Sequence, residues 1–183
     1  MTSAASVAGD ERLRLFLALR LPDDVLDEIE RWQREQMGNV RVVPRGHLHV
    51  TLAFLGHRPV GELESILDAL RDAAAAAGKL RLTPIRYRET RSVGMLALED
   101  EGGRAALLAD DVQERLERLG VYRREDRPWL PHLTVARWRQ RPRLRLEAPP
   151  VRTFVPSDAA AYLSRLHPGG AQYEVLESVA LGG

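Results

Sequence analysis

Hydrophobic residues follow two different periods along this chain, and these periods divide most of it into predicted strands and helices. The apolar run over 13–19, which contains one charged residue, is typical of a buried strand. Apolar positions spaced three and four apart then predict a helix that begins at the acidic residue Asp23 and ends before Gly38. The same spacing predicts helices over 61–77 and 104–119, each followed by a glycine.

The other apolar stretches are short and are bounded by turn residues, as strands are. We expect strands over 40–43, 47–55, 80–87, 93–98, 130–138, 152–155, 160–165 and 173–181, with Gly56 ending the second of them. No linker rich in proline, glycine or serine divides the sequence into independent domains. We therefore predict an α+β fold with antiparallel sheets, in which residues 11–183 form a single two-lobed domain behind a flexible N-terminal tail over 1–10.

A tripeptide pattern, His-x-Thr, occurs twice, as His49-Val50-Thr51 (the first motif) and His132-Leu133-Thr134 (the second motif). Each copy continues into an apolar residue and an alanine. With 5 histidines in 183 residues, random placement would give only about 0.16 such patterns. A single copy is ordinarily a half-buried polar pair on a strand, whereas two copies with matching flanks indicate a shared function. Strand and helix signals surround both copies, so we expect two related lobes that face each other.

Strict alternation along a strand predicts which side chains of the first motif share a face. His49, Thr51 and Ala53 would face a ligand, whereas Phe54 and the even-numbered residues before it would face the core. The second copy places three residues together in the same way: His132, Thr134 and Ala136. The small alanine beside each pair would leave room for a ligand.

Two imidazoles suit an in-line displacement at phosphorus, because one can remove a proton from the attacking group while the other protonates the leaving oxygen. The ordinary pKa of histidine, about 6.5, allows either protonation state near neutral pH. Threonine hydroxyls and backbone amides would hold the nonbridging oxygens as charge develops on them. This chemistry requires no metal ion.

Charge is nearly balanced over the whole chain but not locally. The net charge is +1, yet 27 basic residues include a single lysine, and eight arginines lie between Arg123 and Arg145 against Glu125 and Asp126. Planar guanidinium groups suit phosphate oxygens, so this stretch beside the second motif is compatible with a phosphorylated ligand. Solvated surface charge is an equally good interpretation.

The composition excludes several classes of chemistry. Because the sequence contains no cysteine, the chain has no disulfides, no thiolate nucleophile and no cysteine-based metal site. No segment approaches the roughly 20 apolar residues that span a bilayer. We expect a cytoplasmic, unexported monomer without a membrane segment.

A zinc site formed by His47, His49 and His132 is the main metal alternative, since imidazoles ligate zinc. These strands offer no nearby aspartate, glutamate or cysteine ligand, so we predict neither a metal nor a cofactor. His57 follows Gly56 and His167 lies in a Pro-Gly turn, so both are expected at the surface.

Four segments resemble those of a known family: 14–22 (Arg-Leu-Phe-Leu-Ala-Leu-Arg-Leu-Pro), 48–56 and 127–137 around the two motifs, and 169–173 (Gly-Gly-Ala-Gln-Tyr). On these residues the chain resembles, nearly end to end, the RNA 2′,3′-cyclic phosphodiesterases of bacteria and archaea. They belong to the 2H phosphoesterase superfamily and were historically called 2′-5′ RNA ligases. The paired motifs are specific in this order and spacing, and the terminal segments are weaker support.

The resemblance implies two pseudo-symmetric lobes with antiparallel sheets, flanked by helices, around a central cleft with one motif from each lobe at its floor. His49 would be the proton donor to the departing 3′ oxygen, and His132 the proton acceptor that activates water. Thr51 and Thr134 would bind the phosphate oxygens. The substrates would be RNA ends or nucleotides with a 2′,3′-cyclic phosphate, opened to 2′-phosphomonoesters.

Four further residues are possible cleft residues. His47 would share the strand face of His49, but only His49 is followed by the threonine of the motif. Arg137 matches a family position, although strict alternation turns it away from His132. Phe16 and Tyr173 would either line the cleft or belong to the core. Two alternative functions stay open, namely 2′-5′ RNA ligation through the same histidines and non-catalytic binding of RNA ends through the arginine-rich rim.

Overall fold

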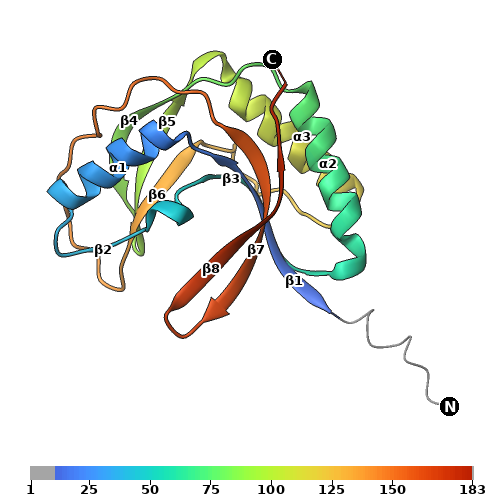
Figure 1. The fold of residues 1–183 in the computed structure, drawn as a ribbon, viewed down its shortest axis with the longest axis horizontal. Coiled ribbons are helices and arrows are strands. Elements are labelled where there is room, and N and C mark those ends of the chain that lie inside the picture. Colours follow the sequence, from blue (N-terminus) through green and yellow to red (C-terminus); the bar gives the residue numbers. More distant parts are fainter. Residues whose placement is uncertain (1–10, 183) are drawn as a thin grey trace.

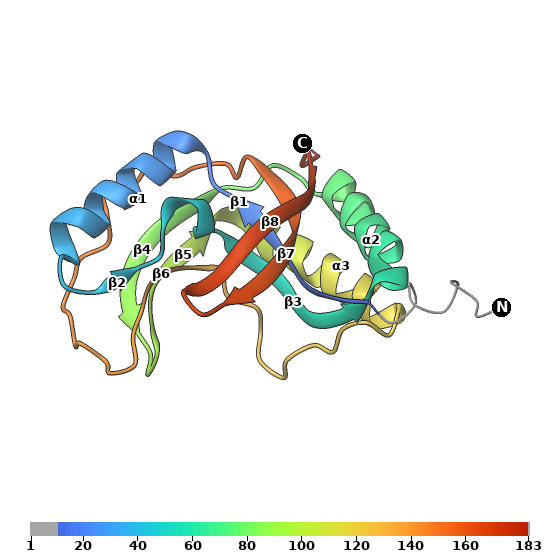
Figure 2. The same cartoon turned by 60° about the horizontal axis from the view of Figure 1, so that its bottom comes forward.

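Two four-stranded antiparallel sheets form the framework of this computed structural model, which describes residues 11–182 (Figures 1 and 2). The β1 sheet has the strand order β3 (Val50–Pro59), β1 (Arg12–Arg20), β7 (Asp158–His167) and β8 (Gly170–Val179). The β6 sheet has the order β2 (Arg41–Val42), β6 (His132–Arg137), β5 (Val93–Asp100) and β4 (Leu82–Glu89). The α+β class with two antiparallel lobes is therefore confirmed. The tail predicted over 1–10 lies outside the described residues.

Three helices cover the outer faces of the sheets: α1 (Asp23–Gln36), α2 (Leu63–Ala76) and α3 (Arg104–Arg118). Their predicted positions agree with the structure to within two residues at each end. Three short 3₁₀ turns lie at Arg45–His47, Val60–Glu62 and Glu101–Gly103. None of the helices in the described part of the chain combines the length and hydrophobicity that a membrane crossing requires.

Two of the helices pack on the sheet opposite to the strand that precedes them. Helix α1 follows β1 but lies against the β6 sheet, where the Trp32 ring is 5.9 Å from the Tyr87 ring of β4. Helix α3 follows β5 but contacts β3 of the β1 sheet. Figure 1 shows α1 beside β4 and β6, with α2 and α3 on the other side of the molecule. The two lobes are thus interleaved along the sequence.

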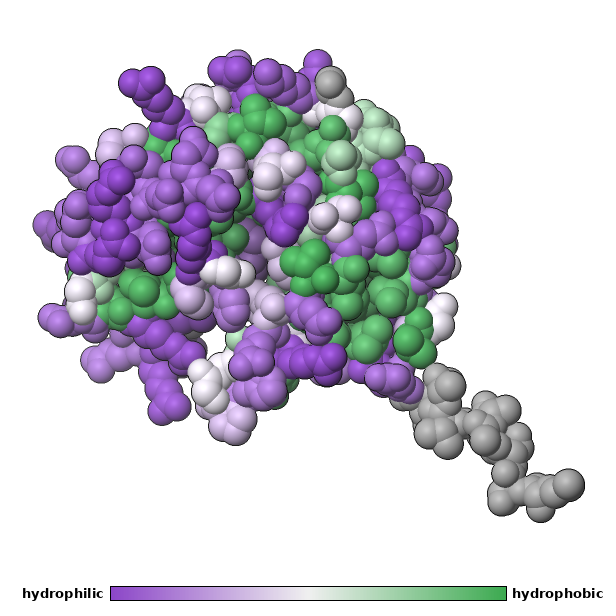
Figure 3. Space-filling model, in the orientation of Figure 1, coloured by the Kyte–Doolittle hydropathy of each residue, from purple (hydrophilic) through white to green (hydrophobic). Residues whose placement is uncertain are grey.

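Strand β1 has a core face and a cleft face. Leu15, Leu17 and Leu19 alternate along it and are at most 1% exposed, in the large core shared by the sheets and helices. Phe16 and Ala18 point the other way, into a small separate cluster on the cleft side. Hydrophilic side chains cover α1 and the outer face of α2, whereas hydrophobic ones are exposed around β1 (Figure 3).

Each motif strand contains a β-bulge one residue after its threonine. The pairing with β1 passes from Thr51 directly to Ala53 and omits Leu52. An extra residue reverses the alternation beyond it. Ala53 is therefore buried in the core and Phe54 is 49% exposed. The predicted orientations of both residues were wrong for this reason.

The second motif strand has the same irregularity at the equivalent position. The pairing of β6 with β5 passes from Thr134 to Ala136 and omits Val135. Val135 and Ala136 are both fully buried, so the prediction that Ala136 shares the face of His132 was also wrong. Arg137 consequently returns to the cleft side.

Three other local predictions differ from the structure. Gly56 does not end β3, because it adopts a φ of +68° at a further bulge opposite Leu15 and the strand continues to Pro59. His47 lies in a 3₁₀ turn, not in a strand. The strand expected over 152–155 is reduced to an isolated bridge between Phe154 and Leu82.

Candidate active site

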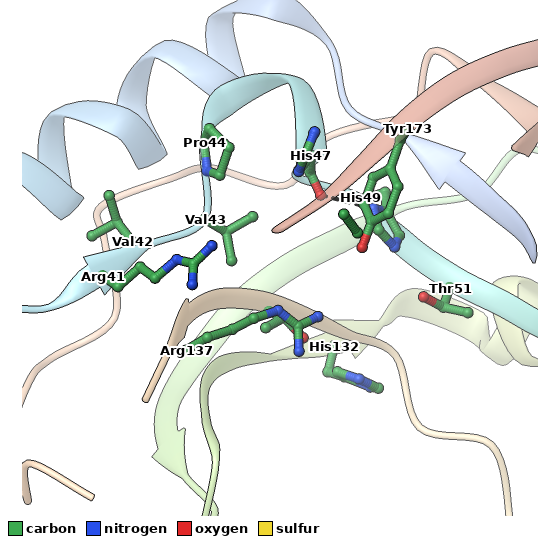
Figure 4. A pocket seen from close by; sticks show the side chains of 12 residues that line it. Arg41, Val42, Val43, Pro44, His47, His49, Thr51, His132, Arg137 and Tyr173 are labelled. Atoms are coloured by element: carbon green, nitrogen blue, oxygen red, sulfur yellow. Dashed lines mark hydrogen bonds between the residues drawn. The ribbon is translucent and has the colours of Figure 1, made fainter. Parts of the chain in front are cut away.

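A cavity of about 130 Å³ lies between the two sheets and is lined by both motifs (Figure 4). This volume is below the roughly 300–1,000 Å³ of pockets that enclose whole drug-sized ligands, so it suits a small group such as a phosphate. The lining comprises Arg41, Val42, Val43, Pro44, His47, His49, Thr51, His132, Thr134, Arg137, Ala171 and Tyr173. Among the predicted cleft residues, Phe16 is the exception, because it lies beneath the cavity.

The two motif imidazoles are held in the same way. Nδ1 of His49 lies 2.8 Å from the carbonyl oxygen of His47, and Nδ1 of His132 lies 3.0 Å from that of Leu130. A carbonyl oxygen only accepts hydrogen bonds, so Nδ1 of each ring donates. In the neutral ring the proton is then on Nδ1, and Nε2 is free to accept one. Each imidazole can therefore exchange a proton with a ligand through Nε2.

His49 lies against a cluster of aromatic rings. Its ring centroid is 4.8 Å from that of Phe16 and 5.7 Å from that of Tyr173. Removal from water disfavours the charged imidazolium. This burial, reinforced by the nearby charge of Arg137, lowers the pKa of His49 to about 4. His49 is accordingly neutral at pH 7 in the free protein.

His47 forms one wall of the cavity. Its ring packs against that of Tyr173, with the centroids 4.3 Å apart and the planes tilted by 32°. Burial and, to a smaller extent, Arg137 lower the pKa of His47 as well. Its backbone carbonyl also orients His49, so this residue contributes through its main chain and its ring.

Arg137 projects into the cavity from β6, as Figure 4 shows. Strict alternation predicted that it faces away from His132, and this was wrong because the bulge at Val135 shifts the alternation by one residue. The guanidinium group is exposed on the cavity side and lowers the pKa of His49 across it. An anion placed between them would contact a positive charge.

Arg41 joins the two lobes on one side of the cavity, and sequence reasoning missed it. Its guanidinium group donates a hydrogen bond to the carbonyl oxygen of Gly169, 3.1 Å away, at the tip of the β7–β8 hairpin. The hairpin also carries Ala171 and Tyr173 over the cavity. No sequence pattern connects these positions, which are more than a hundred residues apart.

Most arginines of the 123–145 stretch do not reach the cavity. Arg124 pairs with Glu117, Arg127 with Glu125, and Arg141 with Glu89. Glu89 also accepts hydrogen bonds from two backbone amides of the stretch, at Arg143 and Leu144. The irregular part of the stretch after β6 is therefore anchored on Glu89, and Arg137, the last residue of β6, is the arginine of the stretch that lines the cavity.

The remaining histidines have the predicted positions. His57 and His167 are exposed at the surface. Across residues 11–182, no group of three histidine, aspartate or glutamate side chains is arranged to hold a metal ion, and this includes His47, His49 and His132.

The family model described as the 2′-5′ RNA ligase superfamily matches residues 21–167, which include both motifs and almost the whole cavity. The chain belongs to this superfamily. The family assignment made from the motifs is thereby confirmed. Among curated relatives, the RNA 2′,3′-cyclic phosphodiesterase of Thermus thermophilus is 35% identical over 188 aligned positions, covering 93% of this chain and 91% of the relative. The protein of the same name from Methanocaldococcus jannaschii is 27% identical and covers 68% and 71%.

Solved structures of other proteins share the fold. The crystal structure of TT0787 of Thermus thermophilus has a TM-score of 0.80 and 29% identity, covering 93% of this chain and 99% of that chain. Apo LigT of E. coli has a TM-score of 0.80 at 22% identity, with the same coverage, and supports the fold alone. The fold of these structures therefore extends along nearly the whole chain.

Proposed function

We propose that this protein hydrolyses the 2′,3′-cyclic phosphate ends of RNA or nucleotides to 2′-phosphomonoesters by metal-independent catalysis with two histidines. The observation that carries the proposal is the meeting of two His-x-Thr motifs, one from each sheet, in a single phosphate-sized cavity. Membership of the superfamily and the names of its curated relatives support the same activity.

In the proposed reaction, Nε2 of His132 accepts a proton from a water molecule, whose oxygen attacks the phosphorus. The bond from phosphorus to the 3′ oxygen breaks, and His49 donates a proton to that oxygen. The phosphate stays on the 2′ oxygen. Thr51, Thr134 and Arg137 hold the nonbridging oxygens, which carry more charge in the transition state.

The low pKa of His49 bears on its role as the proton donor. In the free protein the ring is neutral, so it must gain a proton before it can donate one. A bound phosphodiester brings a negative charge beside His49 and offsets the charge of Arg137, and both effects raise the pKa of His49. We propose that His49 becomes the acid in the complex with substrate.

The decisive assay uses the purified protein with EDTA and a panel of 2′,3′-cyclic and 3′,5′-cyclic nucleotides, followed by identification of each product. We expect 2′-monoesters from the 2′,3′-cyclic compounds and no reaction of the 3′,5′-cyclic ones. Loss of activity with EDTA and its return with zinc or manganese would favour metal-activated water instead. Failure to open any cyclic phosphate would refute the proposal.

A second candidate is 2′-5′ ligation of RNA ends. The equivalent Nδ1 hydrogen bonds of His49 and His132, each to a backbone carbonyl oxygen, let either imidazole donate or accept a proton through Nε2. With a 5′-hydroxyl in place of water, the same displacement forms a 2′-5′ phosphodiester. RNA halves with a 2′,3′-cyclic phosphate and a 5′-hydroxyl test this reaction. Joining faster than opening would assign the protein as a ligase.

A third candidate is a module that binds RNA ends without turnover. Binding of RNA ends with no hydrolysis over a wide pH range would support it.

We also propose that the protein acts in the cytoplasm as a monomer. The cytoplasmic location is consistent with a chain that contains no cysteine. Light scattering on the eluting protein measures the oligomeric state, and a dimer mass would contradict the latter proposal.

A further inference from the structure

Buried polar side chains are rare in this protein, and two of the three in the described residues hold the motif strands. Gln33, Gln113 and Ser164 are the buried polar residues. Nε2 of Gln113, on α3, donates to the carbonyl oxygen of Leu52 at 2.8 Å. Nε2 of Gln33, on α1, donates to the carbonyl oxygen of Val135 at 2.9 Å.

The two glutamines bind equivalent points. Leu52 and Val135 each follow the threonine of a motif, and each is the extra residue of a bulge. A bulge disrupts the regular ladder, so the backbone groups at that point need other partners. A buried carbonyl without a donor is costly. At Leu52 the amide of Gln113 supplies this donor. At Val135 the amide of Gln33 is a second donor beside the backbone amide of Val43.

The bulges determine which residues enter the cleft. At the second bulge, Ala136 turns into the core and Arg137 turns into the cavity. At the first bulge, Ala53 turns into the core two residues after Thr51. A change in the backbone at either bulge would therefore rotate the adjacent motif side chains relative to the cavity.

We propose that Gln33 and Gln113 are matched positioning residues, each fixing the bulge that aims one motif at the phosphate. The inference rests on the proposed function for its catalytic consequence. Helix α1 begins next to β1 and reaches the β6 sheet, whereas α3 begins next to β5 and reaches the β1 sheet. Each amide thus also ties a motif strand to a helix that starts from the opposite lobe.

Gln33 has one further contact. Its Nε2 also donates to the carbonyl oxygen of Val43 at 3.0 Å, and the amide of Val43 donates to the carbonyl oxygen of Val135. Val43 lines the cavity. Gln33 therefore fixes the second motif and the segment after β2 together.

The test compares Gln33→Met and Gln113→Met, which keep the side-chain length but remove the donor, with Ile66→Val. Ile66 is a fully buried residue of α2 whose hydrocarbon side chain donates no hydrogen bond to either bulge, so it serves as a control for a general loss of core stability. Below the unfolding transition, we expect kcat to fall about 10- to 100-fold in each glutamine variant with KM within about threefold, because a displacement near 1 Å has such effects. Ile66→Val should keep wild-type kcat.

A second readout does not depend on catalysis. Ring signals of isotopically labelled histidines report the surroundings of each imidazole by NMR. Gln113→Met should move the signals of His49 and leave those of His132, and Gln33→Met should do the reverse. Wild-type kcat and ring signals in both variants, with only a lower Tm, would overturn the inference. If no cyclic phosphate is hydrolysed by any form, the proposed function fails and the ring signals still decide about the glutamines.

Gln33→Glu and Gln113→Glu keep the test informative if the methionine variants do not fold. A protonated carboxyl can donate the hydrogen bond, whereas a carboxylate cannot. The activity of each variant relative to the wild type should therefore fall as pH rises through the titration of the new carboxyl. A ratio that stays constant with pH would contradict a positioning role for the donor.

Discussion

The indole Nε1 of Trp129 lies 3.0 Å from the carbonyl oxygen of Thr51, to which it donates a hydrogen bond. Trp129 is three residues before His132, so this bond joins the approach to the second motif with the strand of the first. The two motifs come from different sheets, and this contact between them fixes their relative position.

Trp129→Phe should therefore slow catalysis as well as lower stability. The ring is kept but the donor is lost, which removes about 1 kcal/mol from the free energy of unfolding. We expect a severalfold lower kcat, measured well below Tm. Trp138→Phe is the matched control, because its indole donates to Thr90 in the turn between β4 and β5. Equal kcat in both variants would show that the Trp129 bond does not position the motifs.

Replacing either motif histidine should abolish most of the turnover while the protein stays folded. His49→Ala and His132→Ala are each expected to lower kcat by about 10²- to 10⁴-fold, the usual contribution of acid or base assistance. Thr51→Ala and Thr134→Ala should be less severe. His57→Ala, at an exposed histidine, is the control for activity. Parallel loss of Tm and activity in both histidine variants would mean that these residues are structural.

A substrate with a good leaving group should distinguish the proton donor from the acceptor. The departing p-nitrophenolate of a nucleoside phosphodiester needs no proton. His49→Ala should therefore recover activity on this substrate to within about tenfold of the wild type, whereas His132→Ala should not. The opposite pattern would exchange the two roles and make the neutral His49 of the free protein the base.

The stability of the protein should depend on pH through His49. Its pKa is lowered from 6.5 to about 4 in the folded state by burial, so between these values the unfolded state binds the proton and the folded state does not. The free energy of unfolding consequently rises with pH across this window, by about 1.4 kcal/mol per unit. Urea titrations from pH 4 to 7 should show this slope, amounting to roughly 3 kcal/mol, in the wild type. A wild-type slope in His49→Ala would contradict the assignment.

Arg137 should bind the anion directly. The substitution Arg137→Ala removes a charge-assisted hydrogen bond, which contributes about 1.5–3 kcal/mol to binding. The inhibition constant of inorganic phosphate should therefore rise about tenfold or more. The same substitution should raise the pKa of His49, because Arg137 lowers it. Arg139→Ala, two residues away and exposed, is the control. Unchanged phosphate inhibition in Arg137→Ala would exclude the contact.

Much of the fold and the members of the site were predictable because they depend on local patterns. The helices follow from apolar spacing. The pair of motifs predicted that His49 and His132, 83 positions apart, share a site, and both line the same cavity. The α+β class with antiparallel sheets followed from the same patterns. These features require no knowledge of the register between strands.

The errors arose where the register departs from strict alternation. Each bulge reverses the two faces of a strand, and no pattern in the sequence around Leu52 or Val135 indicates a bulge there. Ala53 and Ala136 were therefore placed in the cleft, and Arg137 outside it. Contacts between distant segments, such as Arg41 with Gly169, were also beyond local reasoning.

Interleaving of the lobes has a consequence for how the chain can be divided. A cut in the connection between α2 and β4 would leave β1 and β3 in one fragment and their sheet partners β7 and β8 in the other. Helix α1 would stay with the first fragment, although the sheet that it covers belongs mainly to the second. Neither fragment holds a complete sheet with its own helix, so each alone leaves apolar surface exposed to water. The two lobes on either side of the cavity are therefore not continuous segments of the sequence, and separately expressed halves should regain structure only when they are mixed.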